Sequence, residues 1–328
     1  MLLSHPAKVL VTGASGTLGY NIVHLLASTH PRTQIVLLMR TPAPALFSTC
    51  PKIEIRQVDM FDKARLKQSV LDIQPDAIIH CAASGVRPSN IGWFDLIDLN
   101  VESTNQLFQA SCELEQCHFI HISTGLVYRA QPHPCHEDDP IDTLHPYGAS
   151  KAAADCLLRA GADRLNRHLT VVRPFSFTGL HDGGDRLFPS LLRAARSRTQ
   201  LKMSLGTQLR DFCAVQDVAE FIRLLLNQSN PALDQRDAPK RSVFNLGSGQ
   251  SLPLRSIVET VRQQLDLDVE IHLGELPFHP HEPLHLVADI DRARGLGWQP
   301  RTNLAYAVWQ LAQSQYPDLA VREPKQFP

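Results

Sequence analysis

Short apolar segments alternate with amphipathic segments along the first half of the chain. The apolar segments are bounded by turn residues, a pattern typical of buried β-strands. The predicted strands are Val9–Thr12, Gln34–Met39, Ile53–Val58, Ala77–His80, His118–Ile122 and Leu169–Arg173. The predicted helices between them are Gly16–Ser28, Asp62–Asp72, Asn100–Cys112 and Tyr147–Ala162. This alternation predicts an α/β fold, a doubly wound parallel sheet with helices on both faces.

The alternation weakens after Pro174. The later part of the chain is predicted to contain three helices, Arg186–Arg198, Val215–Leu226 and Leu254–Leu265, and one strand, Ser242–Leu246. We expect residues 1–175 to form the larger domain, with 212–250 returning to it. Residues 176–211 and 251–328 are expected to form a smaller mixed α/β domain.

A glycine-rich turn joins the first strand to the first helix. Gly13, Gly16 and Gly19 follow Thr12 with the spacing G-x-x-G-x-x-G. Glycine lets the backbone approach a pyrophosphate closely, and a helix N-terminus offers free N–H groups and a partial positive charge. A strand, a glycine turn and a helix in this order predict a Rossmann dinucleotide-binding domain. The alternative is a tight turn that binds no ligand.

Tyr147 and Lys151 lie four residues apart on a predicted helix, so they stand one turn apart on one face. A phenol titrates near pH ~10. A neighbouring ammonium favours the phenolate. The pair is therefore a candidate general acid/base for a proton on a hydroxyl or carbonyl oxygen.

Composition excludes several classes of partner. Lys and Arg number 32 against 33 Asp and Glu, a net charge of −1 that argues against nucleic acid or a membrane surface. The chain has seven Cys without C-x-x-C pairing, and its first segment is unlike a secretory signal. We therefore expect the protein in the reducing cytoplasm, with free thiols. Two His-rich segments, 133–139 and 279–285, lack the spacing of a metal site, so no metal is predicted.

The order of the motifs resembles that of the extended short-chain dehydrogenases/reductases, in the nucleotide-sugar epimerase, dehydratase and ketoreductase group of the NAD-dependent epimerase/dehydratase family. The resemblance covers nearly the whole chain. Its motifs are Thr12–Gly19, Asp59–Met60, Ile79–Ala83, Asn100, His121–Tyr128, Tyr147 with Lys151, Arg173–Gly179, Arg210–Phe212, Asn245–Gly249 and Leu296–Pro300.

The resemblance implies a role for each matching residue. Tyr147 would be the acid/base, Lys151 would hold the nicotinamide ribose, and Thr124 would hydrogen-bond the reacting oxygen. The implied cofactor-binding residues are Gly13, Ser15, Gly16, Thr17, Leu18, Gly19, Arg40, Asp59, Met60, Cys81, Ala82, Ala83, Asn100, Tyr147, Lys151 and Pro174. Two of these have structural alternatives: Cys81 as a small buried residue, and Asn100 as a helix N-cap.

The second strand ends in Arg40 rather than in the acid that binds the ribose diol in NAD-preferring relatives. A guanidinium suits a 2′-phosphate. NADP is therefore the preferred cofactor, and NAD stays possible. The alternative is a solvated arginine at the start of a loop.

The residues after Thr124 bear on the reaction. Gly125 and Leu126 offer no carboxylate, which argues against 4,6-dehydration. The preferred reaction is that of a 4-ketoreductase for 4-keto-6-deoxyhexoses. Two features favour it: Arg40, and the Phe-Thr-Gly ending of Arg173–Gly179, which resembles that of reductases. The alternatives are a 4-epimerase with retained NAD, an NADP-binding sensor or chaperone subunit, and a reductase for carbonyl compounds without phosphate.

The substrate is expected to be a nucleotide-linked sugar bound by the smaller domain. Arg210 is the candidate for the diphosphate, because an arginine binds phosphate oxygens bidentately. Ser84, Ser176 and His279 are the other predicted substrate-binding residues, with His279 standing where relatives have an arginine. The resemblance also implies a homodimer paired through Asn100–Cys112 and Tyr147–Ala162.

Overall fold

A computed structural model describes residues 6–40, 47, 49–85, 92–227, 241–278 and 282–327. The chain divides into two compact units. The first comprises Met1–Tyr128, Pro140–Arg173 and Ala219–Phe244, and the second comprises Arg129–Asp139, Pro174–Val218 and Asn245–Pro328.

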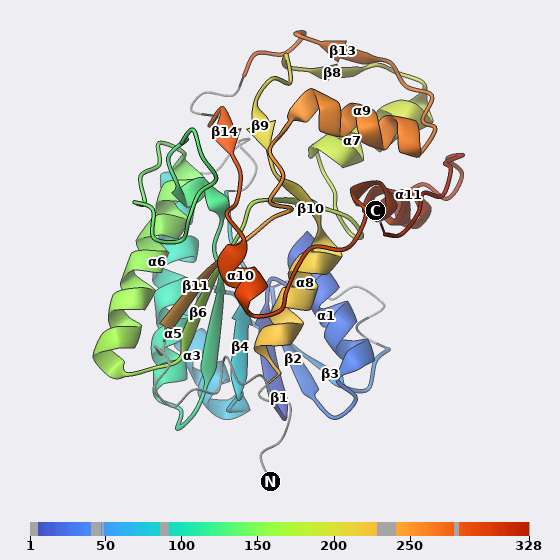
Figure 1. Cartoon of the computed structure of the whole chain (residues 1–328). Helices are drawn as coiled ribbons and strands as arrows, with labels where there is room; N and C mark the ends of the chain where they lie inside the picture. Colours follow the sequence, from blue (N-terminus) through green and yellow to red (C-terminus); the bar gives the residue numbers. More distant parts are fainter. Residues whose placement is uncertain are drawn as a thin grey trace. The chain divides into compact units, whose positions relative to one another are not determined.

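The first unit is built on a sheet of seven strands (Figure 1). Their order across the sheet is β11 (Arg241–Leu246), β6 (Leu169–Pro174), β5 (His118–Ile122), β4 (Ala77–His80), β1 (Lys8–Thr12), β2 (Gln34–Met39) and β3 (Ile53–Gln57). All neighbouring pairs from β3 to β6 are parallel. The chain runs from β1 outward to β2 and β3 and then returns to β4 on the other side of β1. The strand order therefore reverses between β1 and β4, where doubly wound sheets bind their ligands.

Helices cover both faces of this sheet (Figure 1). On one face α3 (Lys63–Ile73), α5 (Thr104–Cys112) and α6 (Pro146–Leu165) pack side by side, and α1 (Thr17–Thr29) lies on the other. Between these three helices and the sheet lies a hydrophobic core, to which all three helices and the strands contribute apolar side chains. Its residues include Leu66, Val70, Phe108 and Leu158 from the helices and Leu10, Ile78 and Phe119 from the strands. The strands β1 and β4 are buried almost throughout, which explains why their segments Val9–Val11 and Ala77–Ile79 are continuously apolar rather than alternating.

The helix predicted from Asn100 begins earlier than expected. It consists of α4 (Trp93–Ile97), a π-helical segment η1 (Asp98–Ser103) and α5. Trp93 and Phe94 are exposed, so the first turn has no apolar face that periodicity could reveal. The prediction of the start at Asn100 was therefore wrong, while the predicted end at Cys112 is confirmed.

The second unit has a helical core and small sheets. The helices α7 (Leu187–Ser197), α9 (Leu254–Gln264) and α11 (Leu304–Gln315) share this core with β8 (Leu201–Met203). The strand pairs are β7 (Ser176–Thr178) with β10 (Phe212–Ala214), β8 with β13 (Ile271–Leu273), and β9 (Leu209–Arg210) between β12 (Leu252–Pro253) and β14 (His285–Leu286). The second unit also contains α10 (Asp291–Gly295), whereas η2 (Gly125–Val127) belongs to the first unit and α8 (Val215–Leu225) begins in the second unit and continues in the first.

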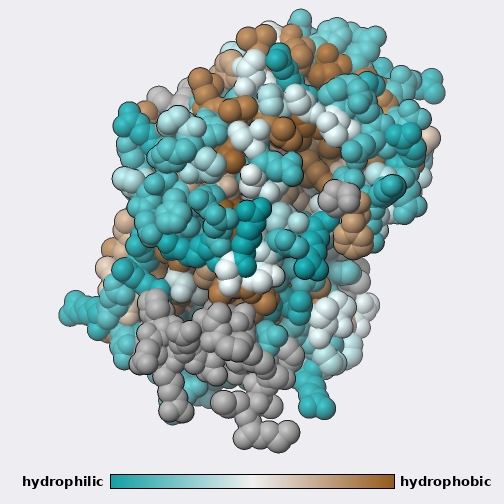
Figure 2. All heavy atoms as spheres, viewed as in Figure 1, coloured by the Kyte–Doolittle hydropathy of each residue, from teal (hydrophilic) through white to brown (hydrophobic). Residues whose placement is uncertain are grey.

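The fold predicted from the sequence, a doubly wound parallel sheet flanked by helices, is confirmed. Hydrophilic residues cover most of the described surface on the face shown in Figure 2. Within the part of the chain that the structure describes, no helix combines the length and apolarity needed to cross a bilayer.

Candidate active site

The glycine turn after β1 lies against the segment after β4. A Cβ atom on Gly13 would stand 2.5 Å from the backbone N of Ala82, and Gly13 has a φ of +71° that favours glycine. A Cβ on Gly19 would stand 2.2 Å from the carbonyl O of Gly13. The turn therefore closes tightly on itself and on Cys81–Ala83 at the reversal of strand order, which is the place for a dinucleotide.

Asn100 holds the segment after β4 in place from the π-helical segment η1. Its Oδ1 accepts from Ser84 N at 2.8 Å, and its Nδ2 donates to Ser84 O at 2.8 Å and to Ser150 Oγ at 2.9 Å. Its side chain is fully buried. Asn100 therefore links the segment Cys81–Ser84 to α6 and does not act as a helix N-cap.

The three predicted catalytic residues belong to two neighbouring elements. Tyr147 and Lys151 lie in the first two turns of α6, and Thr124 is the N-cap of η2, accepting from Leu126 N at 3.2 Å. The helix and η2 touch at Gly148, where a Cβ would stand 2.2 Å from the carbonyl O of Leu126. This contact places the start of α6 beside the turn that carries Thr124.

Lys151 is a fully buried ammonium. Its Nζ has no hydrogen-bond partner among the described residues. Burial lowers the pKa of Lys151 to about 8, and the nearby Asp155 acts in the opposite direction. Because an unpaired buried cation is costly, this atom is poised for an acceptor supplied by a ligand. A ribose hydroxyl is such an acceptor, so the residues present fit a bound nicotinamide dinucleotide.

The other predicted cofactor residues lie at the same end of the sheet. Arg40 follows β2 and is exposed, and Asp59 follows β3 and accepts from Phe61 N at 3.1 Å. Met60 is buried in the hydrophobic core, and Pro174 ends β6. Ser15 is exposed in the glycine turn, while Thr17 and Leu18 begin α1.

The predicted substrate residues that belong to the second unit are tied to its own polar groups. Arg210 donates to Glu282 Oε1 at 2.6 Å and to Leu209 O at 2.9 Å, and only 7% of its surface is exposed. Ser176 opens β7 and donates its N–H to Asp211 O at 3.1 Å. His279 lies outside the described residues.

Asp211, next to Arg210, has a structural role. Its carboxylate accepts from Ser248 Oγ at 2.7 Å, Gly249 N at 3.1 Å and Ala288 N at 3.0 Å. A Cβ on Gly247 would stand 2.3 Å from Asp211 Oδ2. Asp211 therefore fixes the turn after β11 and the segment after β14 within the second unit.

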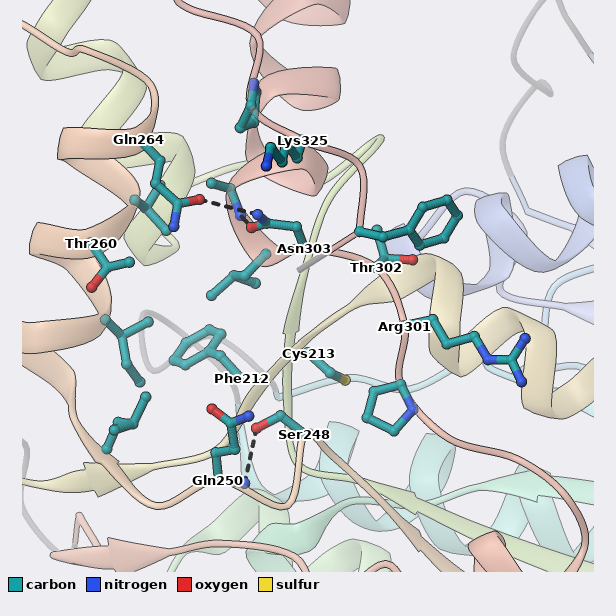
Figure 3. Close-up of a pocket in the computed structure, with 18 of the residues that line it drawn as sticks. Phe212, Cys213, Ser248, Gln250, Thr260, Gln264, Arg301, Thr302, Asn303 and Lys325 are labelled. Atoms are coloured by element: carbon teal, nitrogen blue, oxygen red, sulfur yellow. Dashed lines mark hydrogen bonds between the residues drawn. The ribbon is translucent and has the colours of Figure 1, made fainter.

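A cavity of about 740 Å³ lies within the second unit (Figure 3). Apolar side chains of Phe212, Leu252 and Ile257 line it together with polar groups of Gln250, Gln264 and Asn303. None of the residues predicted for catalysis, cofactor or substrate lines this cavity. The predicted catalytic residues Thr124, Tyr147 and Lys151 all belong to the first unit.

The sequence analysis did not predict the buried polar side chains near Lys151. Asp155, His121 and Arg173 are fully buried together. His80 joins Thr12 Oγ1 at 2.7 Å to Thr104 Oγ1 at 2.8 Å. The available signal was the spacing, because Asp155 follows Lys151 by the same four residues that separate Lys151 from Tyr147.

Comparison with known proteins agrees with this geometry. The model of the NAD dependent epimerase/dehydratase family matches residues 9–247. The chain is 26% identical over 316 residues to UDP-glucose 4-epimerase of Lactobacillus helveticus, covering 90% of this chain and 92% of the relative. It is 22% identical over 315 residues to dTDP-D-glucose 4,6-dehydratase of Mus musculus, covering 91% and 85%.

A solved structure shows the same fold. The structure of MoeE5 in complex with UDP-glucose and NAD matches with a TM-score of 0.81 and 26% sequence identity, over 95% of this chain and 99% of that one. The family match spans the glycine turn, Thr124 and the Tyr147–Lys151 pair. The chain is thus a member of the NAD-dependent epimerase/dehydratase family, among the extended short-chain dehydrogenases/reductases.

Proposed function

We propose that the protein is an NADPH-dependent 4-ketoreductase that acts on a nucleotide-linked 4-keto-6-deoxyhexose. The observation that carries this proposal is the fully buried Lys151 one turn after Tyr147, whose Nζ has no hydrogen-bond partner among the residues that the structure describes. Both lie on the helix that packs beside Thr124. A bound nicotinamide would supply the hydride. The chain must then supply a proton and a fixed geometry for the reacting oxygen.

The three side chains divide this work. Tyr147 gives its phenol proton to the oxygen at C4, which becomes a hydroxyl. Thr124 holds the same oxygen through its hydroxyl, whose acceptor side is already engaged by Leu126 N. Lys151 keeps a positive charge near the phenol, which favours the phenolate left after the transfer.

The surroundings of Thr124 favour reduction over dehydration. Elimination of water from a sugar needs an acid or base beside the reacting carbons. The turn after Thr124 has Gly125 and Leu126, so no carboxylate follows it. A reductase needs only the groups named above.

A 4-epimerase is the second candidate. It is favoured by the similarity to UDP-glucose 4-epimerase and by the NAD in the MoeE5 structure. The same three residues would serve it, because Tyr147 would take the proton in one direction and return it in the other.

One spectroscopic experiment separates the two candidates. The purified protein is mixed with NADPH and a 4-keto-6-deoxyhexose nucleotide, and the nicotinamide absorbance is followed. Stoichiometric loss of NADPH supports the reductase. Interconversion of UDP-glucose and UDP-galactose without added cofactor would instead support the epimerase. If the protein shows neither of the two activities, the proposal is refuted.

The exposed Arg40 should set the preference for NADP. We expect Arg40→Asp to weaken NADPH binding by roughly 10–100-fold, the effect of losing a charge-assisted hydrogen bond to a phosphate. NADH binding should not weaken. Fluorescence titration with both cofactors measures the two constants. The control is Arg32→Asp, because Arg32 is also exposed but precedes the start of β2. This substitution should change neither dissociation constant. An unchanged NADPH constant in Arg40→Asp would remove the argument for NADP.

Arg210 should bind the diphosphate of the substrate. The Arg210→Gln/Glu282→Gln double variant replaces the buried ion pair by an amide pair, so no unpaired charge is left. We expect its KM for the nucleotide sugar to rise by roughly 10–100-fold while cofactor affinity stays unchanged. Arg196→Gln, in an exposed ion pair with Asp318 at 3.0 Å, is the control and should leave KM unchanged. Equal KM values for the two variants would contradict the role of Arg210.

Two further expectations stay predictions. The protein is expected in the cytoplasm, and a homodimer is expected through α5 and α6. Leu157 and Leu165 on α6 are exposed, as a helix that pairs with a second subunit requires.

A further inference from the structure

A cluster of buried polar groups lies next to Lys151 in the first unit. Asp155 follows Lys151 by one turn of α6, and its carboxylate accepts from Arg173 Nε at 3.0 Å. His121 Nε2, from β5, stands 3.5 Å from the other carboxylate oxygen, which is long for a hydrogen bond. Arg173 in turn donates to Tyr128 Oη at 2.5 Å. The side chains of Lys151, Asp155, His121 and Arg173 are all inaccessible to solvent.

The charges in this cluster do not cancel. Burial and the charge of Lys151 lower the pKa of His121 to about 4, and burial holds the pKa of His80 well below its usual value. Burial raises the pKa of the Cys81 thiol to about 12. These three groups are therefore neutral near pH 7. Two cations, Lys151 and Arg173, remain.

Asp155 is the one anion of this cluster, and it faces both cations. Burial acts to raise the pKa of Asp155, but His121 and Arg173 outweigh it and hold that pKa below its usual value. Among the described elements packed against α6, η1 presents Asn100 to Ser150, α5 presents Phe108 to Gly161, and η2 contains no acid. The one acid of α4, Asp95, is exposed, whereas Lys151 is fully buried. The acids of η1, Asp98 and Glu102, are paired with Lys63 instead.

We propose that Asp155 is a positioning residue of the active site, whose carboxylate keeps Lys151 protonated. Arg173 fixes that carboxylate from β6. The inference rests on the proposed role of Lys151 beside Tyr147. It extends the catalytic group by a residue that touches neither substrate nor cofactor and acts through the lysine.

The test measures the titration of Lys151 itself. In protein labelled with ¹³C at lysine Cε, NMR follows the Lys151 signal, assigned by its loss in Lys151→Gln. The wild-type midpoint is expected near 8. In Asp155→Asn the midpoint should fall by roughly one unit, the effect of losing a neighbouring opposite charge. At pH 8 the protonated fraction would then fall from half to about a tenth, and the alkaline limb of kcat/KM would move to lower pH by the same amount.

Two further variants distinguish charge from packing. Arg173→Gln removes the competing cation and should move the Lys151 midpoint upward, opposite to Asp155→Asn, whereas loss of packing would disturb both variants alike. Asp163→Asn, an exposed acid on the same helix paired with Arg241 at 2.9 Å, should leave the midpoint unchanged. If Asp155→Asn does not fold, the Asp155→Asn/Arg173→Gln double variant keeps an amide pair, and its Lys151 midpoint should lie below that of Arg173→Gln.

The proposal would be overturned by a midpoint in Asp155→Asn equal to that of the wild type, or by one in the double variant equal to that of Arg173→Gln. A shift in Arg173→Gln of the same sign as in Asp155→Asn would overturn it as well. The NMR titration needs no turnover, so an inactive protein would count against the proposed function and leave the result on Asp155 readable.

Discussion

Replacing Tyr147 by Phe is expected to lower kcat by ~10²–10⁴-fold, the usual contribution of a positioned general acid or base. The substitution removes one hydroxyl from a side chain that is 8% exposed. It leaves the ring in place near Gly85, where a glycine Cβ would stand 3.4 Å from Tyr147 Cδ2. The dissociation constant of the cofactor should change by less than about threefold, because Lys151 and the glycine turn are untouched. Steady-state kinetics and fluorescence titration measure the two quantities.

The matched control for Tyr147→Phe is Tyr306→Phe. Tyr306 lies in α11 and stacks on Trp309 with ring centroids 5.3 Å apart. Loss of its hydroxyl should leave kcat within about twofold of the wild type. If Tyr147→Phe retains full activity, proton transfer does not pass through this residue and the proposed mechanism fails.

The sheet of the first unit was predictable because most of its strands, though not the edge strand β3, are buried along nearly their whole length. Gln34–Met39, Ala77–His80 and His118–Ile122 have the bounds that the apolar segments predict. Continuous apolar segments of this length between turns leave little choice of structure. The start of α4 was not predictable, because its first residues are exposed aromatics that no periodicity distinguishes from a loop.

The second unit shows the limit of the same reasoning. Its strands β8, β9 and β12 are two or three residues long. A strand of this length has no period, and its pairing depends on contacts that are remote in sequence. The helix α11 was also missed, although Asn303 caps it by accepting from Ala305 N at 2.9 Å.

The residues of the candidate site could be predicted from the sequence, but the hydrogen bonds that hold them in place could not. Tyr147, Lys151 and the three glycines follow from spacing. The partnership of Asn100 with Ser84 and Ser150 does not, because a buried amide can serve any segment within its reach. Arg210 illustrates the same limit: its sequence motif indicates an anion site, and the structure shows that an anion of the chain, Glu282, already occupies part of its guanidinium.

Replacing Gly13 by Ala is expected to destabilise the first unit by ~2–5 kcal/mol. About 1–2 kcal/mol comes from a non-glycine residue at the left-handed φ of +71°. A further ~1–3 kcal/mol comes from overpacking, because the new Cβ would stand 2.5 Å from Ala82 N and 2.6 Å from Cys81 C. Urea unfolding followed by circular dichroism measures the change.

The same substitution should abolish dinucleotide binding, and the two effects have one cause. Cys81 N donates to Thr12 O at 3.2 Å, and Ala82 N donates to Thr12 Oγ1 at 3.3 Å, so the ends of β1 and β4 are joined beside Gly13. A Cβ there must push these segments apart, and the backbone N–H groups of the turn move with them. Gly183→Ala is the control, because no atom lies within 4 Å of its Cβ position, and its stability should stay within about 0.5 kcal/mol of the wild type. A Gly13→Ala protein that binds NADPH with unchanged affinity would show that the dinucleotide lies elsewhere.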